Sequence, residues 1–512
     1  MNRRVAILWS VLLNSCFIHA QKVLYSPVID DRYTSHFEIA GKTSAFYWVL
    51  KEEKTSSKHY AFPRQHFEIF DSRLKPVNNQ LDFILTGNTE KEYLIAGKNH
   101  FDKMLIIGDT GKTDISLQRF SEDGSQFSPN KIILSLPFNE PGNSFLLLRS
   151  EDKSKIMLLC FESVPDSPPK LHTILFDENW HQLLYKTYQH PFITQPVIQD
   201  DFTCYPIESF DCMAIQLANN GQWLMAAPSR TSNNFLLFHF CDDGSGFSYK
   251  EIMLPPASDL EDLSLTINNA RGEASAGLLS KFHYRALKNI QVVHYSMVTQ
   301  GFDFDSAYRF NTLSGSSFKN ENLVQERLVA IPGSGFLLLK EYGRSFQSTG
   351  EDNGWDPSLF FAENVLTDNT VSIYSNNEVY TKFNKLASGN NEYHRGDLAL
   401  FYFPAQSKDS CWRALISKQQ ITEMNSPNLS YVLFPEKEKL ALLYNSFLND
   451  GEEQYGSSTF LDKQGNIIND GGIIFWKFNV MLNFQQARQI SGDEVAVPYH
   501  NNQRLGFAII GF

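Results

Sequence analysis

Residues 143–163 read "NSFLLLRSEDKSKIMLLCFES" and hold two apolar segments, Phe145–Leu148 and Ile156–Phe161, separated by a polar stretch. Each segment has the length of one β-strand, and neither alternates apolar with polar residues. A strand with one solvated face does alternate, so these two strands must be covered on both faces. The stretch therefore predicts a pair of strands buried between two other layers.

The same pattern recurs along the chain as a unit of four strands. The stretch above continues with "LHTILF" (171–176) and "QLLYKTY" (182–188), and similar units lie at 93–136 and 212–254. Repeated four-strand units of about 50 to 65 residues are typical of β-propeller blades, each of which packs between two neighbours. We therefore predict an all-β fold.

The predicted architecture is a single β-propeller of about seven four-stranded blades, within a range of roughly six to eight. Counting starts at the unit 44–85, and strands remain at both ends of the chain: "HFEIAG" (36–41) at one end, "EVAVPY" (494–499) and "RLGFAII" (504–510) at the other. Propellers commonly close by combining strands from the two termini in one blade, which removes free sheet edges. We expect this closure here.

A turn that begins with aspartate follows the third strand of several units. Examples are "EIFDSRLKPV" (68–77), "ILFDENWHQL" (174–183) and "TFLDKQGNII" (459–468). Aspartate favours such turns because its side chain bonds nearby backbone groups, and glycine favours them because it tolerates positive φ. We interpret these aspartates as structural.

Composition is that of a folded protein, with 42% hydrophobic and 20% charged residues among 512. The 41 Phe and 21 Tyr favour packed strands. The net charge is −12, and no basic run occurs beyond the N-terminus. Nucleic-acid binding needs a clustered positive surface, so we predict no nucleic-acid partner.

The first residues predict an export signal. Arg3 and Arg4 precede an apolar stretch at 5–18, which is too short for a membrane span, and Ala20 offers a small residue before Gln21. We predict a signal peptide at 1–20 and a mature chain at 21–512, exported to the periplasm, the cell surface or the medium. No later stretch is apolar over the roughly 18 residues that a transmembrane helix needs.

Lipoprotein processing at "LNSC" is the rival interpretation, with Cys16 as the acylated first residue. Asn14 fits that signal poorly, and the apolar run continues past Cys16. We therefore favour simple secretion. Export permits disulfides, and Cys204 and Cys212 flank a short loop that a disulfide could close.

The longest departure from the repeat is an insertion at about 341–428, and insertions in repeat proteins often map to the binding face. It contains aromatic residues beside arginine and aspartate, a combination that stacks on apolar faces and bonds polar groups of carbohydrates or peptides. The candidate ligand-binding residues are Tyr342, Arg344, Trp355, Tyr393, His394, Arg395 and Asp397. In the competing interpretation, Tyr342 and Asp397 have no binding role and are simply the residues at which strands terminate.

Several C-terminal segments carry a family resemblance: "GSGFLLLKEYGR", "NSPNLSYV", "LLYNSF", "LNFQQARQI" and "QRLGFAII". They resemble exported propeller-like proteins common in Bacteroidota. The resemblance covers about the last third of the chain and the export signal. It implies secretion and a propeller fold, and because this group carries no assigned activity it implies no catalytic residue.

The sequence holds no phosphate-binding or dinucleotide motif, no "HExxH" and no closely spaced Cys or His ligand pairs. We therefore predict no catalytic residue, no metal and no cofactor. The leading hypothesis is a non-catalytic exported propeller that binds carbohydrate or protein at the cell envelope or serves there as a scaffold. The alternative is a glycan- or peptide-processing enzyme with its site on one propeller face, where carboxylates could perform acid–base chemistry.

Overall fold

The computed structural model describes residues 22–30, 34–53, 64–84, 89–109, 111–137, 144–162, 169–189, 214–229, 234–241, 246–283, 287–311, 322–331, 334–347, 372–374, 391–405, 411–416, 420–422, 431–435, 439–448, 453–470, 481–484, 487–491, 493–501 and 504–512. These residues form the strands β1 to β36 and contain no α-helix.

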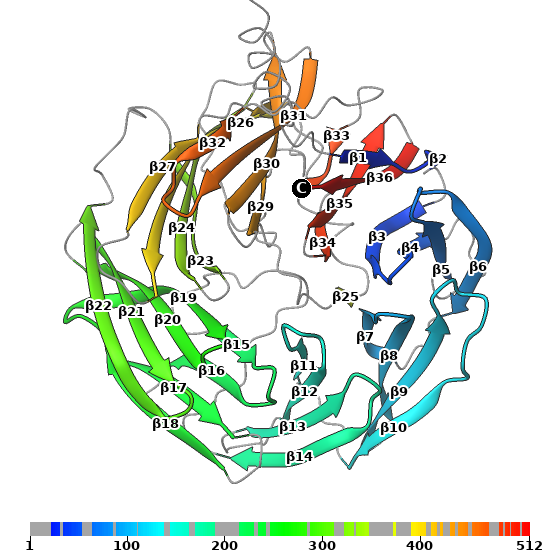
Figure 1. Cartoon of the computed structure of the whole chain (residues 1–512), viewed down its shortest axis with the longest axis horizontal. Coiled ribbons are helices and arrows are strands. Elements are labelled where there is room, and N and C mark those ends of the chain that lie inside the picture. The colour runs from blue at the N-terminus through cyan, green and yellow to red at the C-terminus, as the bar shows by residue number, and fades with distance from the viewer. Residues whose placement is uncertain are drawn as a thin grey trace, which may run out of the picture.

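The strands form eight antiparallel sheets that stand around a common centre as the blades of one ring (Figure 1). The prediction of a single β-propeller is thus confirmed, and eight blades lie within the predicted range. The estimate of about seven falls one short because the closing blade, made of short strands from both termini, has no four-strand unit of its own in the sequence.

The first four blades follow one another in the N-terminal half. Blade 1 contains β3 (Thr34–Lys42), β4 (Phe46–Glu53), β5 (Arg64–Asp71) and β6 (Pro76–Ile84). Blade 2 contains β7 (Thr89–Ala96), β8 (His100–Asp109), β9 (Lys112–Ser121) and β10 (Lys131–Leu136), and β25 (Ser372–Tyr374) joins it. Blade 3 contains β11 (Ser144–Arg149), β12 (Lys155–Glu162), β13 (Lys170–Asp177) and β14 (Gln182–Gln189). Blade 4 contains β15 (Ala214–Leu217), β16 (Trp223–Pro228), β17 (Asn234–Phe240) and β18 (Phe247–Met253).

The other four blades complete the ring. Blade 5 contains β19 (Ser258–Asn268), β20 (Glu273–Phe282), β21 (Leu287–Ser296) and β22 (Gly301–Asn311). Blade 6 contains β23 (Asn322–Ile331), β24 (Gly335–Gln347), β26 (Asn391–Pro404), β27 (Trp412–Ile416) and β28 (Gln420–Thr422). Blade 7 contains β29 (Tyr431–Pro435), β30 (Lys439–Leu448), β31 (Glu453–Asp462) and β32 (Ile467–Asp470). Blade 8 contains β33 (Met481–Leu482), β34 (Arg488–Ser491), β35 (Glu494–Asn501) and β36 (Arg504–Gly511), with β1 (Lys22–Tyr25) and β2 (Ile29–Asp30).

Strand β12 explains why the opening stretch does not alternate. Ile156, Leu158 and Cys160 pack with residues of blade 2, whereas Met157 and Leu159 pack with residues of blade 4. Both faces of the strand are therefore buried against apolar neighbours, and every second residue serves a different interface. A continuous apolar run is the consequence.

Blade 8 closes the ring as expected, with an N-terminal strand beside C-terminal ones. Strand β1 pairs with β36, so that Val23 lies opposite Ile510. One detail of the prediction is wrong: "HFEIAG" (36–41) belongs to β3, which pairs with β4 inside blade 1. The strand that closes the ring comes instead from "KVLY" (22–25), immediately after the predicted signal peptide.

The aspartate turns adopt one conformation. In each, the Asp carboxylate accepts bonds from the backbone amides two and four residues later, at 2.8–2.9 Å: Asp71, Asp177 and Asp462 are these aspartates. The residue three places after the aspartate has positive φ, and it is Leu74, Trp180 or Gly465. The structural interpretation of these aspartates fits this geometry.

Tryptophan indoles that donate to a turn of the next blade join neighbouring blades. Trp48 of blade 1 donates Nε1–H to the Glu122 carbonyl of blade 2, at 3.1 Å. Trp412 of blade 6 donates in the same way to the Lys463 carbonyl of blade 7, at 2.8 Å. Each contact satisfies a buried or half-buried indole and fixes the angle between two blades.

Candidate functional site

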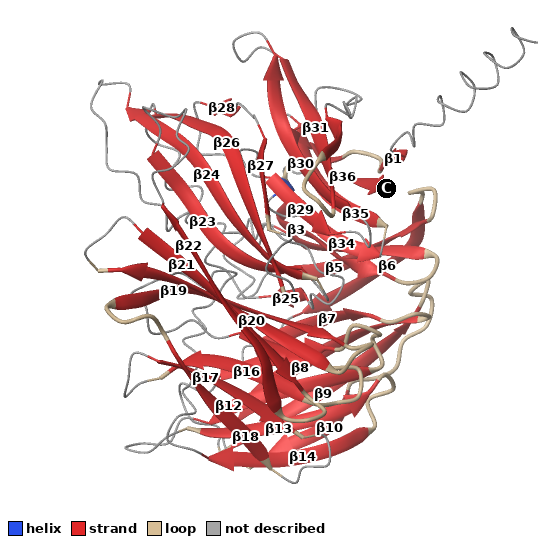
Figure 2. Cartoon of the chain, turned by 60° about the vertical axis from the view of Figure 1, so that its left-hand side comes forward, coloured by secondary structure: helices blue, strands red, loops and turns tan. Residues whose placement is uncertain are grey.

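Blade 6 differs from the others in the length of its central strands. Strands β24 and β26 contain 13 and 14 residues, whereas the central strands β20 and β21 of blade 5 contain 10 each. Figure 2 shows β24 and β26 side by side over their length. Strand β28 pairs with the outer part of β26, so the extension beyond the regular blade is itself a small three-stranded sheet.

The register of this extension brings most of the predicted site residues together. Arg344 lies opposite His394, and its neighbours Gly343 and Ser345 lie opposite Arg395 and Tyr393. The structure describes the four predicted site residues among them by their backbone positions, whereas Trp355 lies outside the described residues.

Tyr342 and Asp397 lie where the regular blade passes into the extension. The pairing of β24 with β26 shifts register between Glu341 and Gly343. Tyr342 therefore lies at a β-bulge, opposite the stretch of β26 that contains Asp397. Such bulges redirect side chains and commonly occur beside functional sites. Burial, together with the nearby Glu326 carboxylate, raises the pKa of the Tyr342 hydroxyl, which is therefore protonated at neutral pH.

A buried ion network lies beneath this step and connects blades 5 and 6. The Lys340 ammonium is 2.6 Å from Glu326, and Lys288 of blade 5 bridges Glu326 to Glu261. Burial alone would lower the pKa of Lys288, but the two carboxylates outweigh it and raise that pKa. Two lysines and two carboxylates thus neutralise one another, and the network fixes the base of the extension.

An aromatic ring with two cations lies on the same side of blade 6. The Arg413 guanidinium lies 5.4 Å from the centre of the Phe401 ring, and the Lys340 ammonium lies 6.0 Å from it. Arg413 is exposed, so its guanidinium can meet solvent or a ligand while its planar group stays positioned by the ring. We call Tyr342, Asp397, Phe401 and Arg413, with the register-paired residues of the extension, the blade 6 site.

Sequence reasoning missed Phe401 and Arg413, because both lie in ordinary strand patterns. Their signal is weak: "RALI" (413–416) contains one arginine beside an apolar run. It also missed Glu326 and Lys340, whose partnership depends on the register of two strands. A charged residue inside an apolar strand predicts a buried partner, but it does not identify that partner.

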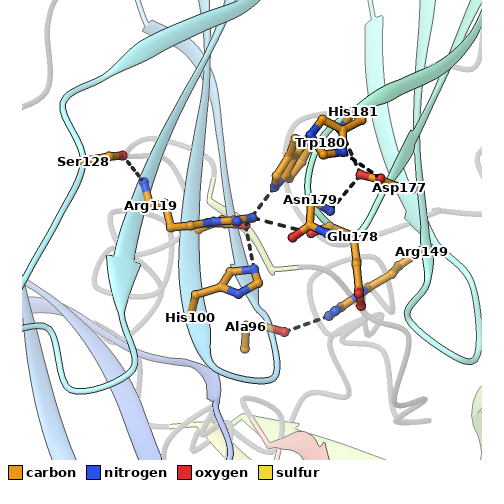
Figure 3. A network of polar contacts seen from close by, with 11 residues as sticks. Ala96, His100, Arg119, Ser128, Arg149, Asp177, Glu178, Asn179, Trp180 and His181 are labelled. Carbon is orange, nitrogen blue, oxygen red and sulfur yellow. Dashed lines mark hydrogen bonds and ion pairs between the residues drawn. The ribbon is translucent and has the colours of Figure 1, made fainter.

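A second polar cluster joins blades 2 and 3 and is shown in Figure 3. The buried Asp102 carboxylate accepts Arg119 Nε at 2.8 Å and Arg119 Nη2 at 2.9 Å, and Trp180 Nε1 at 2.8 Å. His100 Nε2 lies 3.2 Å from the same carboxylate. Burial would raise the pKa of Asp102, but His100 and Arg119 hold it below its usual value. With its oxygens saturated by these donors, Asp102 is suited to a structural role.

A third cluster lies on blade 3. The buried His172 imidazole places Nε2 2.8 Å from the Glu162 carboxylate, and Nδ1 3.1 Å from Thr187 Oγ1 and 3.2 Å from the Tyr185 hydroxyl. Lys170 lies 3.4 Å from Glu162. Burial lowers the pKa of His172, although Glu162 opposes that effect. The neutral tautomer that donates from Nε2 to Glu162 and accepts at Nδ1 satisfies the whole cluster.

The remaining predictions can be located briefly. Cys204 and Cys212 lie outside the described residues, and Cys160, Cys241 and Cys411 are present as thiols. Within the described ranges, no group of three or more His, Cys, Asp or Glu side chains is arranged to hold a metal ion. Over those same ranges, no helix has the length and apolar character needed to cross a membrane.

Comparison with known proteins identifies no family. No family model matches the chain, and no curated protein matches it. Among solved structures, the WD40 domain of SCAP from fission yeast is similar over 96% of this chain and 98% of its own, with a TM-score of 0.42 and 8% identity. The Dos1 propeller is similar over 95% of each chain, with a TM-score of 0.40 and 8% identity. These similarities are too distant to say anything about function.

Proposed function

We propose that this protein is an exported, non-catalytic propeller that binds carbohydrate at the cell envelope through the blade 6 site. The observation that carries the proposal is the extension of β24 and β26 beyond the regular blade. In its backbone register Arg344 pairs with His394, and Tyr393 and Arg395 occupy the neighbouring positions of β26; this register, with the ion pairs of Glu326 to Lys340 and Lys288 in the regular part of the blade, supports the proposal.

The chemistry of the site suits a carbohydrate ligand. An aromatic ring presents an apolar face to the carbon–hydrogen face of a sugar, and a guanidinium bonds two oxygens at once. Arg413 is exposed, so its guanidinium can bond a ligand, whereas the half-buried Phe401 ring beside it packs against the apolar cluster between blades 5 and 6. The carboxylates Glu326 and Glu261 already carry lysine partners, which favours binding over acid–base catalysis at this site.

The test is a glycan array probed with the mature chain, residues 21–512, and with two variants. The double variant Tyr393→Ala/Arg395→Ala removes two predicted ligand-binding side chains from the extension. Arg271→Ala is the control, because Arg271 lies in the turn between β19 and β20 and therefore at the opposite end of the strands from the β24–β26 connection. We expect the double variant to lose the array signal and the control to keep it.

Mass spectrometry of the bound glycan after prolonged incubation completes the test. An unchanged glycan supports a binding protein, whereas shortened products would establish the enzymatic alternative. If both variants keep the array signal, the glycan binds somewhere other than the blade 6 site. Absence of any glycan signal would refute the carbohydrate ligand and leave a protein ligand as the class to examine.

A further inference from the structure

Two cations lie against the Phe401 ring of blade 6, and their surroundings differ. The Lys340 ammonium is buried and lies 2.6 Å from the Glu326 carboxylate, so its charge is already neutralised inside the protein. The Arg413 guanidinium lies against the same ring but is exposed to solvent. Among the residues that the structure describes, no carboxylate lies within ion-pair distance of Arg413. Its charge is therefore available to a ligand.

Strand β27 leaves Arg413 on an exposed face. Ala414 and Ile416 are buried in the apolar cluster between blades 6 and 7. Arg413 and Leu415 alternate with them and are exposed, Leu415 to 39%. A guanidinium and an apolar side chain thus lie two residues apart on one face of the strand. Such a face can contact the carbon–hydrogen surface of a sugar while the guanidinium bonds a charged substituent.

Strand pairing and the aromatic ring hold Arg413 in place. Its backbone pairs with Phe401 in the neighbouring strand β26, and its guanidinium lies 5.4 Å from the centre of that ring. The ring in turn packs against the apolar cluster between blades 5 and 6. A guanidinium positioned in this way loses little rotamer freedom on binding, and its planar fork matches two oxygens of a carboxylate or a sulfate. Arg413 is therefore better prepared to bind an anionic group than an arginine without such support.

The Tyr342 hydroxyl lies near enough to feel this guanidinium. Burial is the main cause that raises the pKa of Tyr342, the Glu326 carboxylate raises it further, and the Arg413 charge opposes them. The hydroxyl therefore remains a hydrogen-bond donor at neutral pH. Because Lys340 and Lys288 already bind Glu326, that carboxylate does not neutralise Arg413. The guanidinium thus remains without a paired carboxylate among the described residues, in a chain whose net charge is −12.

We propose that the carbohydrate bound at the blade 6 site is acidic, with a carboxylate or a sulfate group that binds the Arg413 guanidinium. The inference rests on the proposed carbohydrate-binding function and adds the chemical class of the ligand. A charged acceptor forms a charge-assisted hydrogen bond with the guanidinium, whereas a neutral hydroxyl forms a weaker one. A neutral glycan of the same shape therefore binds less tightly than the acidic one.

A glycan array printed with matched pairs tests the class of ligand on the mature chain, residues 21–512. Uronate-containing oligosaccharides lie beside their methyl esters, and sulfated oligosaccharides lie beside their desulfated forms, so the members of each pair differ in charge and share one sugar backbone. Isothermal titration calorimetry then gives the Kd for both members of the pair with the strongest signal. We expect the charged member to bind about tenfold more tightly than the neutral one. The pair that shows the difference distinguishes a carboxylate from a sulfate.

Three variants locate the charge recognition. Arg413→Gln removes the charge, and we expect it to bind the charged and the neutral member of the pair alike. Arg413→Lys keeps the charge without the planar fork, so it should retain part of the preference. Arg73→Gln is the matched control, because Arg73 is also exposed but lies in the turn between β5 and β6 of blade 1, and it should keep the full preference. Thermal melting of each variant verifies that it is folded.

The outcomes separate this inference from the function on which it rests. Equal or tighter binding of the neutral members would refute the acidic ligand and leave carbohydrate binding in place. A preference for charged members that Arg413→Gln retains would show that another residue binds the anion, and it would overturn the role of Arg413. Absence of any signal on the array would refute the carbohydrate-binding function itself, and the acidic ligand with it.

Discussion

At the scale of single residues, some polar side chains in the blade interfaces bind several partners at once. Asp102 is the clearest case: Arg119 is on its own blade, whereas Trp180 reaches it from blade 3 (Figure 3). Trp180 has φ of 65°, in the left-handed region that a bulky residue rarely occupies. The indole bond to Asp102 helps to stabilise this backbone conformation, so one carboxylate supports both the interface and the turn.

We predict that Asp102→Asn destabilises the protein by about 3 kcal/mol, because it removes a buried charge from its partners and points amide hydrogens at donors. Chemical unfolding monitored by tryptophan fluorescence measures the effect. Asp114→Asn is the control: Asp114 is half-buried and pairs with an exposed cation, Lys112, and with the Ser135 hydroxyl, so we expect a loss of at most about 1 kcal/mol. Equal stability of the two variants would show that the cluster does not join the blades.

His172 predicts a dependence of stability on pH. Burial lowers its pKa below the ordinary value of 6.5, and Glu162 offsets this only in part. The unfolded chain therefore takes up a proton on His172 at a higher pH than the folded chain does. The stabilising contribution of the neutral imidazole is present above pH 6.5 and is lost as the pH falls through the folded pKa.

The variant His172→Gln tests this dependence, since glutamine can hydrogen bond but does not titrate. We expect it to be less stable than the wild type at pH 7.5 and the difference to shrink as the pH approaches 5. Urea unfolding at a series of pH values measures how the free energy of unfolding of the wild type and of the variant changes with pH. A difference that stays constant over this range would mean that His172 contributes by packing alone, without regard to Glu162, Lys170 and Tyr185 around it.

At the scale of elements, the aspartate turns show how local sequence fixes the contacts between blades. The turn after β31 has Gly465 at its left-handed position, with φ of 78°. The Trp412 ring of blade 6 lies against it, because a Cβ at Gly465 would be 2.4 Å from that ring. Glycine is needed at this position for two reasons: the backbone has positive φ, and the Trp412 indole leaves no room for a Cβ.

We predict that Gly465→Ala costs more stability than Gly111→Ala. Gly111 also has positive φ, 74°, but nothing lies within 4 Å of a Cβ placed on it. The Gly111 variant should therefore lose about 1 kcal/mol from backbone strain, and the Gly465 variant about 1–3 kcal/mol more because the Trp412 ring must move. Thermal melting of both variants measures the difference. Equal losses would show that the indole adapts without cost.

The elements also show which features the sequence can predict. The strand β12 and the turn at Asp177 are visible in the sequence because burial on both faces and turn chemistry leave local patterns. The bulge at Tyr342 is not, because it depends on how β24 and β26 slide past each other. The pairing of β25 with β7 is also hidden, since a strand of three residues carries no periodic signal.

The same limit applies to the candidate sites. The predicted residues Arg344 and His394 do lie opposite each other, because both flank one long connection. Phe401 and Arg413 could not be found, because strand pairing rather than sequence proximity brings them together. Pairs such as Glu162 and His172 likewise require the register of neighbouring strands, and a single polar residue in an apolar strand indicates only that some partner exists.

At the scale of the whole molecule, the N-terminal segment of the described chain closes the ring. The Ser26 amide donates to the Phe507 carbonyl at 2.9 Å, the Ser26 hydroxyl accepts the Phe507 amide at 3.0 Å, and the Ser26 carbonyl accepts the Tyr499 hydroxyl at 2.9 Å. Blade 8 then contacts blade 1 through Arg488, which lies 3.2 Å from Glu38. These contacts remove the free edge of β36 and make the eight blades one closed structure.

The most direct test of the closed ring is a disulfide between the two termini. Val23 and Ile510 are paired across β1 and β36, so Val23→Cys/Ile510→Cys places two thiols at the separation of a cross-strand pair. Val23→Cys/Val298→Cys is the control, because Val298 is 78% exposed in blade 5. Peptide mapping after mild oxidation should find residues 23 and 510 linked and a raised melting temperature, with no link in the control. Failure of the first pair to link in the folded protein, or equal linking in the control, would contradict an eight-bladed ring closed by its N-terminal strand.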